Sequence, residues 1–151
     1  MRLTFDLSEM PFDEIHRFLA EESYWARGIP ESTLRRACEH SICACIVDGS
    51  SLAGFARVVT DRATYAYLCD VFVTVPYRNR GISHQMMRAL DAHPDLQGLR
   101  RWMLMTRDAQ SLYAQHGFTP LPDPTRAMER HDPDVYQRMQ RTQTPHPAEK
   151  P

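Results

Sequence analysis

The residues most able to do chemistry lie in one segment, 73–87, where a short basic loop joins a β-branched stretch to a helical pattern. Residues 78–83 of this segment read Arg-Asn-Arg-Gly-Ile-Ser. The first turn of a helix has N–H groups without intrahelical partners, and the helix dipole adds about half a positive charge there. A glycine lets an anion approach the backbone, and arginines add charged donors. The segment therefore predicts an anion site at a helix start, although a solvated turn with two arginines fits the same residues.

A second pattern lies downstream, where residues 109–118 have the spacing A-x-x-x-Y-x-x-x-G-F. It follows a stretch with the character of a strand, and its tyrosine is Tyr113. With the R-x-x-G-x-S spacing of residues 78–83, this sequence resembles the GNAT N-acetyltransferase superfamily, whose loop pattern is Q/R-x-x-G-x-G/A. The resemblance is clear from about residue 43 to residue 118, and the order of elements extends it to about residue 128.

The resemblance implies a co-substrate, a reaction and a set of residues. Members of this family bind acetyl-CoA and transfer its acetyl group to an amine. Tyr113 falls at the position of the general acid, and such a proton transfer contributes roughly 10²–10⁴ in rate. The residues implied in binding the cofactor lie on the central strand, in the loop and downstream: Val71, Phe72, Val73, Arg78, Asn79, Arg80, Gly81, Ile82, Ser83, Thr106 and Tyr113.

Three positions depart from the family pattern. Ser83 replaces the usual glycine or alanine, but serine is small and keeps its N–H group. Thr106 stands where many members have an asparagine that contacts the cofactor. Cys69 stands where some members have a glutamate base, and a thiol is a poor base unless its pKa is lowered. Asp70 is the nearest carboxylate, and it fits a base, a proton relay or a structural hydrogen-bond acceptor. A water chain without a dedicated base is a further alternative.

An aromatic loop lies between the first two helical patterns. In the family this region lines the acceptor side. The resemblance therefore implies that Tyr24, Trp25 and Arg57 shape a pocket for the amine. The alternative is that the two aromatic residues only cap the hydrophobic core.

Periodicity outlines the elements that must position these residues. We expect strands at 2–7, 41–47, 52–60, 64–75 and 101–106, and helices at 11–22, 31–40, 81–93 and 109–116. A last strand at 118–119, with a partner at 127–129, is also expected. The turn at 48–50 predicts a hairpin, and the helix between the later strands predicts a parallel pair. This order predicts an α/β domain with a mixed, mostly antiparallel central sheet flanked by helices, and the resemblance implies the GNAT type.

Composition is that of an ordinary globular domain, with 42% hydrophobic and 25% charged residues in 151. A net charge of −1, from 18 basic and 19 acidic side chains, disfavours nucleic-acid binding through bulk charge. We find neither a bilayer-length apolar run nor a signal-peptide core, so we expect a cytoplasmic protein without a membrane partner. The four cysteines form no C-x-x-C pair and the seven histidines no ligand spacing, which predicts reduced, buried thiols and no metal.

We expect a single N-acetyltransferase domain at 1–137 and a polar, disordered tail at 138–151. The expected activity moves an acetyl group from acetyl-CoA to a primary amine of a small molecule or peptide. A non-catalytic acyl-CoA sensor is the alternative. An ATP-binding module is disfavoured, because the loop lacks the G-x-x-x-x-G-K-[ST] pattern. The resemblance is compatible with a homodimer, and the sequence leaves the acceptor open.

Overall fold

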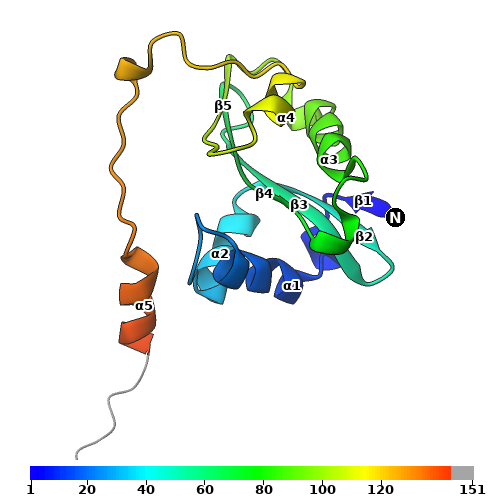
Figure 1. Cartoon of the computed structure of the whole chain (residues 1–151), viewed down its shortest axis with the longest axis vertical. Coiled ribbons are helices and arrows are strands. Elements are labelled where there is room, and N and C mark those ends of the chain that lie inside the picture. Colours follow the sequence, from blue (N-terminus) through cyan, green and yellow to red (C-terminus); the bar gives the residue numbers. More distant parts are fainter. Residues whose placement is uncertain (144–151) are drawn as a thin grey trace, which may run out of the picture.

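A five-stranded sheet forms the centre of the computed structural model, which describes residues 1–143 (Figure 1). The strands lie in chain order: β1 (Arg2–Thr4), β2 (Ile42–Asp48), β3 (Ser51–Thr60), β4 (Tyr65–Val73) and β5 (Arg101–Leu104). The first four pair antiparallel in succession, and β5 pairs parallel with β4. The mixed, mostly antiparallel sheet predicted from the sequence is therefore confirmed.

Five α-helices accompany the sheet: α1 (Phe12–Arg17), α2 (Glu31–Glu39), α3 (Ile82–Asp91), α4 (Gln110–Ala114) and α5 (Val135–Gln143). The helix expected at 11–22 is two pieces, because α1 passes into a π-helical turn at Phe18–Glu22. Ser23 follows this turn, and its hydroxyl donates to the carbonyl of Leu19 at 2.6 Å. Within residues 1–143, none of the helices has the length and apolar character of a membrane span.

Two hydrophobic cores lie on opposite faces of the sheet. One contains side chains from α1, the π-helical turn and α2, with Phe55 and Phe72 from the strands. The other contains the inner side chains of α3 with Tyr113 of α4. Figure 1 shows α1 and α2 on one side of the strands and α3 and α4 on the other. The sheet is thus covered on both faces, and β4, which lies between β3 and the edge strand β5, contributes to both cores.

The prediction of a last strand at 118–119, with a partner at 127–129, is wrong. Among the described residues no strand follows β5, and every residue from 119 to 134 is exposed. Pro120, Pro122 and Pro124 lie in this segment. Proline has no N–H group to donate to a strand ladder, and this accounts for the missing pair.

The disordered tail expected from residue 138 is also wrong for residues 138–143, because α5 spans Val135–Gln143 and the expected boundary at 137 falls inside it. Val135, Tyr136 and Met139 are half-buried, and the other residues up to 142 are exposed. The spacing of these inward residues is that of one helical face, which accounts for a helix where composition alone indicated disorder. Residues 144–151 of the expected tail lie outside the described residues.

Candidate active site

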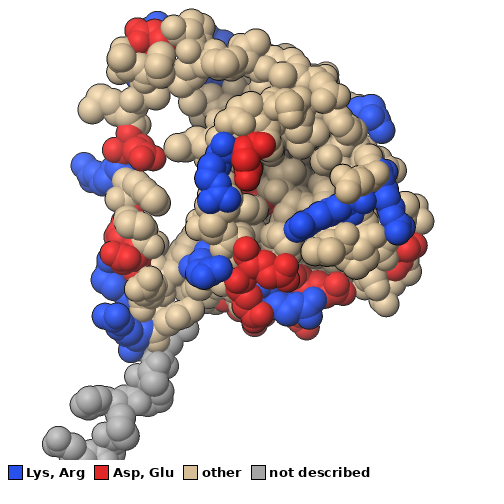
Figure 2. Space-filling view, in the orientation of Figure 1, with Lys and Arg blue, Asp and Glu red and all other residues tan. Residues whose placement is uncertain are grey.

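The candidate site forms where β4 and β5 stop pairing. Their parallel register begins at Tyr65↔Arg101 and ends at Leu68↔Leu104, yet β4 continues to Val73. The backbone of Val71, Phe72 and Val73 therefore has no strand beside it on the β5 side, within the part of the chain that is described. Figure 2 shows that this face is hollowed, with charged side chains around the rim. Unpaired strand backbone beside a hollow can hydrogen-bond an extended ligand.

A bulge in β4 produces this divergence. Phe55 pairs with Phe72 and Arg57 with Cys69, so one residue of β3 faces two of β4. Asp70 lies in the bulge with a φ of 53°, a left-handed conformation that is uncommon outside glycine. The bulge also exchanges the faces of the strand: Leu68 packs in the core beneath α3, whereas Phe72 stacks on Phe18 at 3.8 Å in the other core.

The loop after β4 carries the predicted anion site. Gly81 precedes α3 with a φ of 73°, and no side chain caps the helix. The first backbone bond of the helix runs from Gln85 N–H to the Gly81 carbonyl at 3.0 Å. Within residues 1–143, the N–H groups of Ile82, Ser83 and His84 have no acceptor. A ten-residue helix with unpaired first-turn donors is suited to a phosphate group.

The two arginines of the loop lie along its flanks. The Nε of Arg78 donates to the carbonyl of Val73 at 3.2 Å, which ties the loop to the end of β4. The guanidinium of Arg80 lies 5.6 Å from the centre of the Tyr77 ring. Asn79 has a φ of 60°, so the turn uses left-handed geometry at Asn79 as well as at Gly81. Both arginines are exposed and remain available to a negatively charged ligand.

Tyr113 lies on α4 with its ring in the core that includes α3, and it is 8% exposed. Burial, followed by the nearby Tyr24 and Asp108, raises the pKa of Tyr113 to about 12. Its hydroxyl therefore stays protonated near neutral pH. In the described part of the chain, no group hydrogen-bonds to this hydroxyl, which leaves its proton available.

Two contacts hold α4 in place. Thr106, which the resemblance implied in cofactor binding, accepts a hydrogen bond from the N–H of Ala109 at 3.0 Å and so fixes the turn that leads into α4. At the other end, the ring nitrogens of His84 and His116 are 2.9 Å apart, linking the first turn of α3 to the end of α4. The segment that carries Tyr113 is thus tied directly to the helix start that carries the anion site.

The predicted acceptor residues meet around Asp70. The Nε of Arg57 donates to one oxygen of the Asp70 carboxylate at 2.7 Å, and the Trp25 indole N–H donates to the other at 3.0 Å. The pair is largely buried, with 16% of the Arg57 side chain and 7% of the Asp70 side chain exposed. Arg57 also donates to the hydroxyl of Ser41 at 3.1 Å. Asp70 is thus paired with Arg57, and both of its carboxylate oxygens accept a hydrogen bond, so it is not a free base.

Tyr24 links this acceptor group to Tyr113. Its ring lies edge-on to Trp25 at 5.0 Å, and the guanidinium of Arg107 lies 3.9 Å above its centre. Tyr24 is also among the groups that raise the pKa of Tyr113. The structure therefore brings the predicted acceptor residues Tyr24, Trp25 and Arg57 into one group.

Cys69 does not supply a base. Burial, followed by the charge of Asp70, raises the pKa of the Cys69 thiol to about 12. Cys38, Cys43, Cys45 and Cys69 are all free thiols, as expected from the sequence. No group of His, Cys, Asp or Glu residues suited to a metal ion occurs in residues 1–143.

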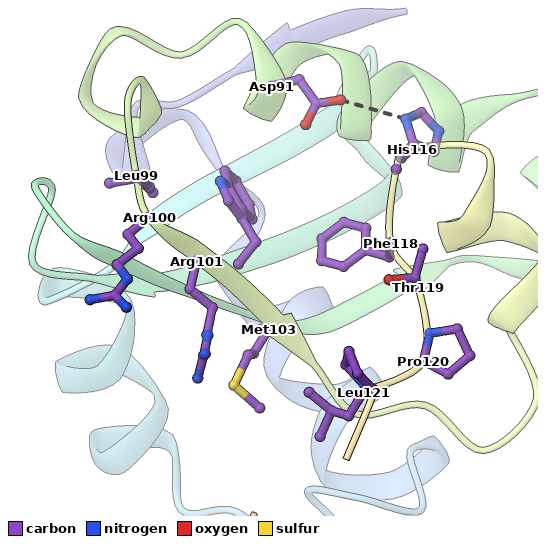
Figure 3. Close-up of a pocket in the computed structure, with 13 residues that line it drawn as sticks. Asp91, Leu99, Arg100, Arg101, Met103, His116, Phe118, Thr119, Pro120 and Leu121 are labelled. Carbon is purple, nitrogen blue, oxygen red and sulfur yellow. Dashed lines mark ion pairs between the residues drawn. The ribbon is translucent and has the colours of Figure 1, made fainter. Parts of the chain in front are cut away.

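A cavity of about 410 Å³ lies on the other side of β5 (Figure 3). It is lined by residues of β5, by Asp91 at the end of α3 and by the segment after α4. Figure 3 shows His116 and Asp91 facing each other across its rim, 3.5 Å apart. None of the predicted site residues lines it, so we do not assign it to the site.

Two residues that the sequence did not single out, Arg107 and Tyr136, lie near the predicted acceptor residues or on the core beside them. Arg107 covers Tyr24, and the ring of Tyr136 packs against the core that contains α1 and α2. The spacing of Val135, Tyr136 and Met139 could have indicated a helix. No local pattern indicates where that helix docks.

Residues 38–120 match the family model described as the acetyltransferase (GNAT) domain, which is more than half of the 151 residues. This chain belongs to the GNAT acetyltransferase family. It is therefore an acyltransferase, and members of this family use acetyl-CoA as co-substrate. The GNAT type of fold expected from the two sequence patterns is confirmed.

Known proteins resemble this GNAT chain over shares of its length that run from 48% to 89%. A crystal structure of a candidate GNAT acetyltransferase from Xanthomonas campestris pv. campestris superposes with a TM-score of 0.85 at 48% identity, covering 89% of this chain and 95% of that one. A candidate acetyltransferase of Gibberella zeae is 26% identical over 133 residues, 74% of each protein. A mycothiol acetyltransferase of Pseudarthrobacter chlorophenolicus is 32% identical over 74 residues, 48% of this chain and 23% of that protein.

Proposed function

We propose that this GNAT protein transfers the acetyl group of acetyl-CoA to a primary amine of a small molecule or peptide. The observation that carries the proposal is the protonated hydroxyl of Tyr113, which no described group hydrogen-bonds. The ring of Tyr113 shares a core with α3, whose first-turn N–H groups are unpaired. An acid and an anion site joined through α3 and α4 are what transfer from a CoA thioester requires.

The residues at the start of α3 fit the pyrophosphate of the co-substrate. The unpaired N–H groups of Ile82, Ser83 and His84 would donate to it, with Arg78, Asn79 and Arg80 at the rim. The backbone of Val71, Phe72 and Val73 would hydrogen-bond the pantetheine arm, because no strand pairs with it on that side in residues 1–143. Thr106 has a different part in this proposal. It holds the start of α4 through its bond from Ala109, and its own O–H group remains a donor toward the co-substrate.

The transfer needs one proton to leave and another to arrive. The amine nitrogen forms a bond to the acetyl carbon as the carbon–sulfur bond breaks, so the nitrogen loses a proton and the sulfur gains one. Tyr113 would donate the proton to the sulfur. A positioned general acid contributes roughly 10²–10⁴ in rate.

We assign the removal of the amine proton to water. Asp70 would not take this proton but would position the neighbouring side chains. Both oxygens of Asp70 already accept hydrogen bonds, one of them from the guanidinium of Arg57. Neither oxygen is therefore free of a partner, which disfavours Asp70 as the direct acceptor of the amine proton. Asp70 would instead fix Arg57 and Trp25 on the acceptor side, where Tyr24 completes the wall.

The direct test is the release of CoA thiol from acetyl-CoA in the presence of a broad panel of primary amines. We expect turnover by the wild-type protein, and we expect Tyr113→Phe to bind CoA with unchanged affinity but turn over slowly. If the wild-type protein binds CoA and acetylates no amine of the panel, a non-catalytic acyl-CoA sensor replaces this proposal.

A further inference from the structure

Helix α5 reaches the acceptor side through a segment that contributes nothing to the core. We call residues 119–134 the strap, and each of them is exposed. Figure 1 shows the strap running apart from the rest of the molecule before α5 returns beside α2. Ordering an exposed segment costs conformational entropy of about 1–2 kcal/mol per residue. Because the strap buries no side chain in the core, its own packing does not explain why α5 lies where it does.

The contacts of α5 are to the aromatic acceptor loop and to the helix that follows it. The side-chain amide of Gln140 donates to the carbonyl of Gly28 at 2.8 Å. The hydroxyl of Thr33, in the first turn of α2, lies 3.9 Å from the sulfur of Met139. A Cβ on Gly28 would come within 3.4 Å of the Gln140 amide, so the two backbones approach closely there. Helix α5 is thus held against the loop that carries Tyr24 and Trp25.

Tyr136 is the residue of α5 that faces the reaction side. Its ring packs against the core that contains α1 and α2. Burial, followed by the charge of Asp70, raises the pKa of Tyr136, and the charge of Arg57 acts on it in the opposite direction. The ring of Tyr136 thus packs on the core that contains Phe72, two residues after Asp70 on β4.

Exposed aromatic rings lie in the loop against which α5 is held. Tyr24 is 52% exposed and Trp25 is 42% exposed, and exposed large rings beside a reaction centre are typical of binding sites. Two carboxylates near these rings are each paired with an arginine: Asp70 with Arg57 at 2.7 Å and Asp108 with Arg107 at 3.7 Å. Neutralised carboxylates give a polycation little to bind, whereas exposed rings favour a flat apolar group.

We propose that Tyr136, Tyr24 and Trp25 form an aromatic acceptor site, that α5 delivers Tyr136 to it, and that the amine accepted there carries an aromatic ring. This inference rests on the proposed acetyl transfer and names its acceptor class. Tyr136 contacts the ring of the acceptor, and it takes no part in the proton transfers.

The test compares two probes, 2-phenylethylamine and 1,4-diaminobutane, with acetyl-CoA as donor. We expect the wild-type protein to have the higher kcat/KM with 2-phenylethylamine. Tyr136→Ser removes the ring and raises the KM for this amine about tenfold, the effect of losing a ring contact. Tyr136→Phe keeps the ring and leaves that KM nearly unchanged. The matched control is Tyr65→Ser, since Tyr65 is 37% exposed and lies at the opposite end of β4 from the open end.

A binding measurement gives a readout besides turnover. In a Trp102→Phe background, Trp25 is the remaining tryptophan of the chain, and titration with 2-phenylethylamine should change its fluorescence. Adding Tyr136→Ser should shift the midpoint about tenfold upward, while the KM for acetyl-CoA stays the same.

Three outcomes would overturn the inference. The first is an equal KM for 2-phenylethylamine, and an equal fluorescence midpoint, in wild type and Tyr136→Ser. The second is a higher kcat/KM with 1,4-diaminobutane than with 2-phenylethylamine. The third is a wild-type protein that binds acetyl-CoA but neither binds nor acetylates 2-phenylethylamine. Failure of the wild-type protein to bind acetyl-CoA at all would instead count against the proposed function.

Discussion

The two sides of the open end of β4 are built in different ways. The co-substrate side is contiguous in sequence and consists mostly of backbone: the loop after β4 and the first turn of α3. The acceptor side is assembled from side chains far apart in the chain. Trp25 bonds to Asp70 across 45 positions, and Gln140 bonds to Gly28 across 112. A short sequence can therefore encode the first side, whereas the second exists only after the whole chain has folded.

The two sides also differ in how much their polar groups contribute to the stability of the fold. At the start of α3, Gly81 is exposed and Ser83 and His84 are half-buried, whereas Ile82 is buried. Water can satisfy the accessible donors of a helix start until a ligand arrives. The Arg57–Asp70 pair is buried, and a buried charge is costly once its partner is removed. Substitutions should thus affect mainly ligand binding on the first side and mainly folding on the second.

The largest effect is expected where the two sides meet, at Tyr113. Tyr113→Phe should lower kcat by about 10²–10⁴, because the general acid is lost while the ring remains in the core. The KM for acetyl-CoA should change little. Steady-state kinetics would measure this, with Tyr65→Phe at the start of β4 as the control. An unchanged kcat in Tyr113→Phe would remove Tyr113 from the mechanism.

The next effect separates a buried ion pair from an exposed one. Arg57→Met leaves the Asp70 carboxylate buried without its cation and should lower the free energy of unfolding by about 3–5 kcal/mol. The matched control is Arg62→Met, which breaks the pair of Arg62 with Asp95, whose side chains are 56% and 41% exposed. That control should cost less than about 1 kcal/mol.

Urea unfolding of both variants measures the difference. Equal losses would mean that the acceptor side does not depend on its buried pair, and the contrast between the two sides would then fail.

The same contrast explains what could be predicted from the sequence. The loop at 78–83 could be recognised because the donors of a helix start are a local property, and the order of strands and helices followed from periodicity. The bulge could not be foreseen, because no local pattern marks Asp70 for a left-handed φ within a strand. Asp70 and Arg57 were each named, but not as partners, since their contact depends on the register of β3 with β4.

The end of the chain shows the same limit. The strands expected at 118–119 and 127–129 ignored the prolines between them, and the tail expected from residue 138 ignored a helical face. The contact of Tyr136 with the acceptor side depends on where α5 docks. Docking is set by Gly28 and Thr33, more than 100 positions away.

A smaller effect distinguishes backbone geometry from ligand binding. Gly81 and Gly49 both have a positive φ, 73° and 61°, and an added Cβ would meet nothing within 4 Å at either position. Gly81→Ala and Gly49→Ala should therefore each cost about 1 kcal/mol in the free energy of unfolding. Only Gly81→Ala should weaken CoA binding, by about tenfold, because its methyl group lies beside the anion site. Calorimetric titration checks this, and equal affinities in both variants would argue against a phosphate at Gly81.

The smallest effect is an alkaline one. The pKa of Tyr113 is raised to about 12 from an ordinary value of 10.0. Its neutral hydroxyl therefore contributes stability that is complete below pH 10 and is lost as the pH rises from 10 to about 12. Over that range the unfolding free energy should fall more steeply in wild type than in Tyr113→Phe. The remaining slope in the variant comes partly from Cys45 and Cys69, whose pKa values are also raised to about 12 by burial.

The most direct test of the central claim, that CoA binds along β4 with its pyrophosphate at the start of α3, is a titration of the protein with CoA followed by amide NMR. We predict the largest shifts at the amides of Gly81, Ile82, Ser83 and His84, with a second group at Val71, Phe72 and Val73. Shifts confined to the cavity between β5 and the segment after α4, at Trp102 and Phe118, would contradict it.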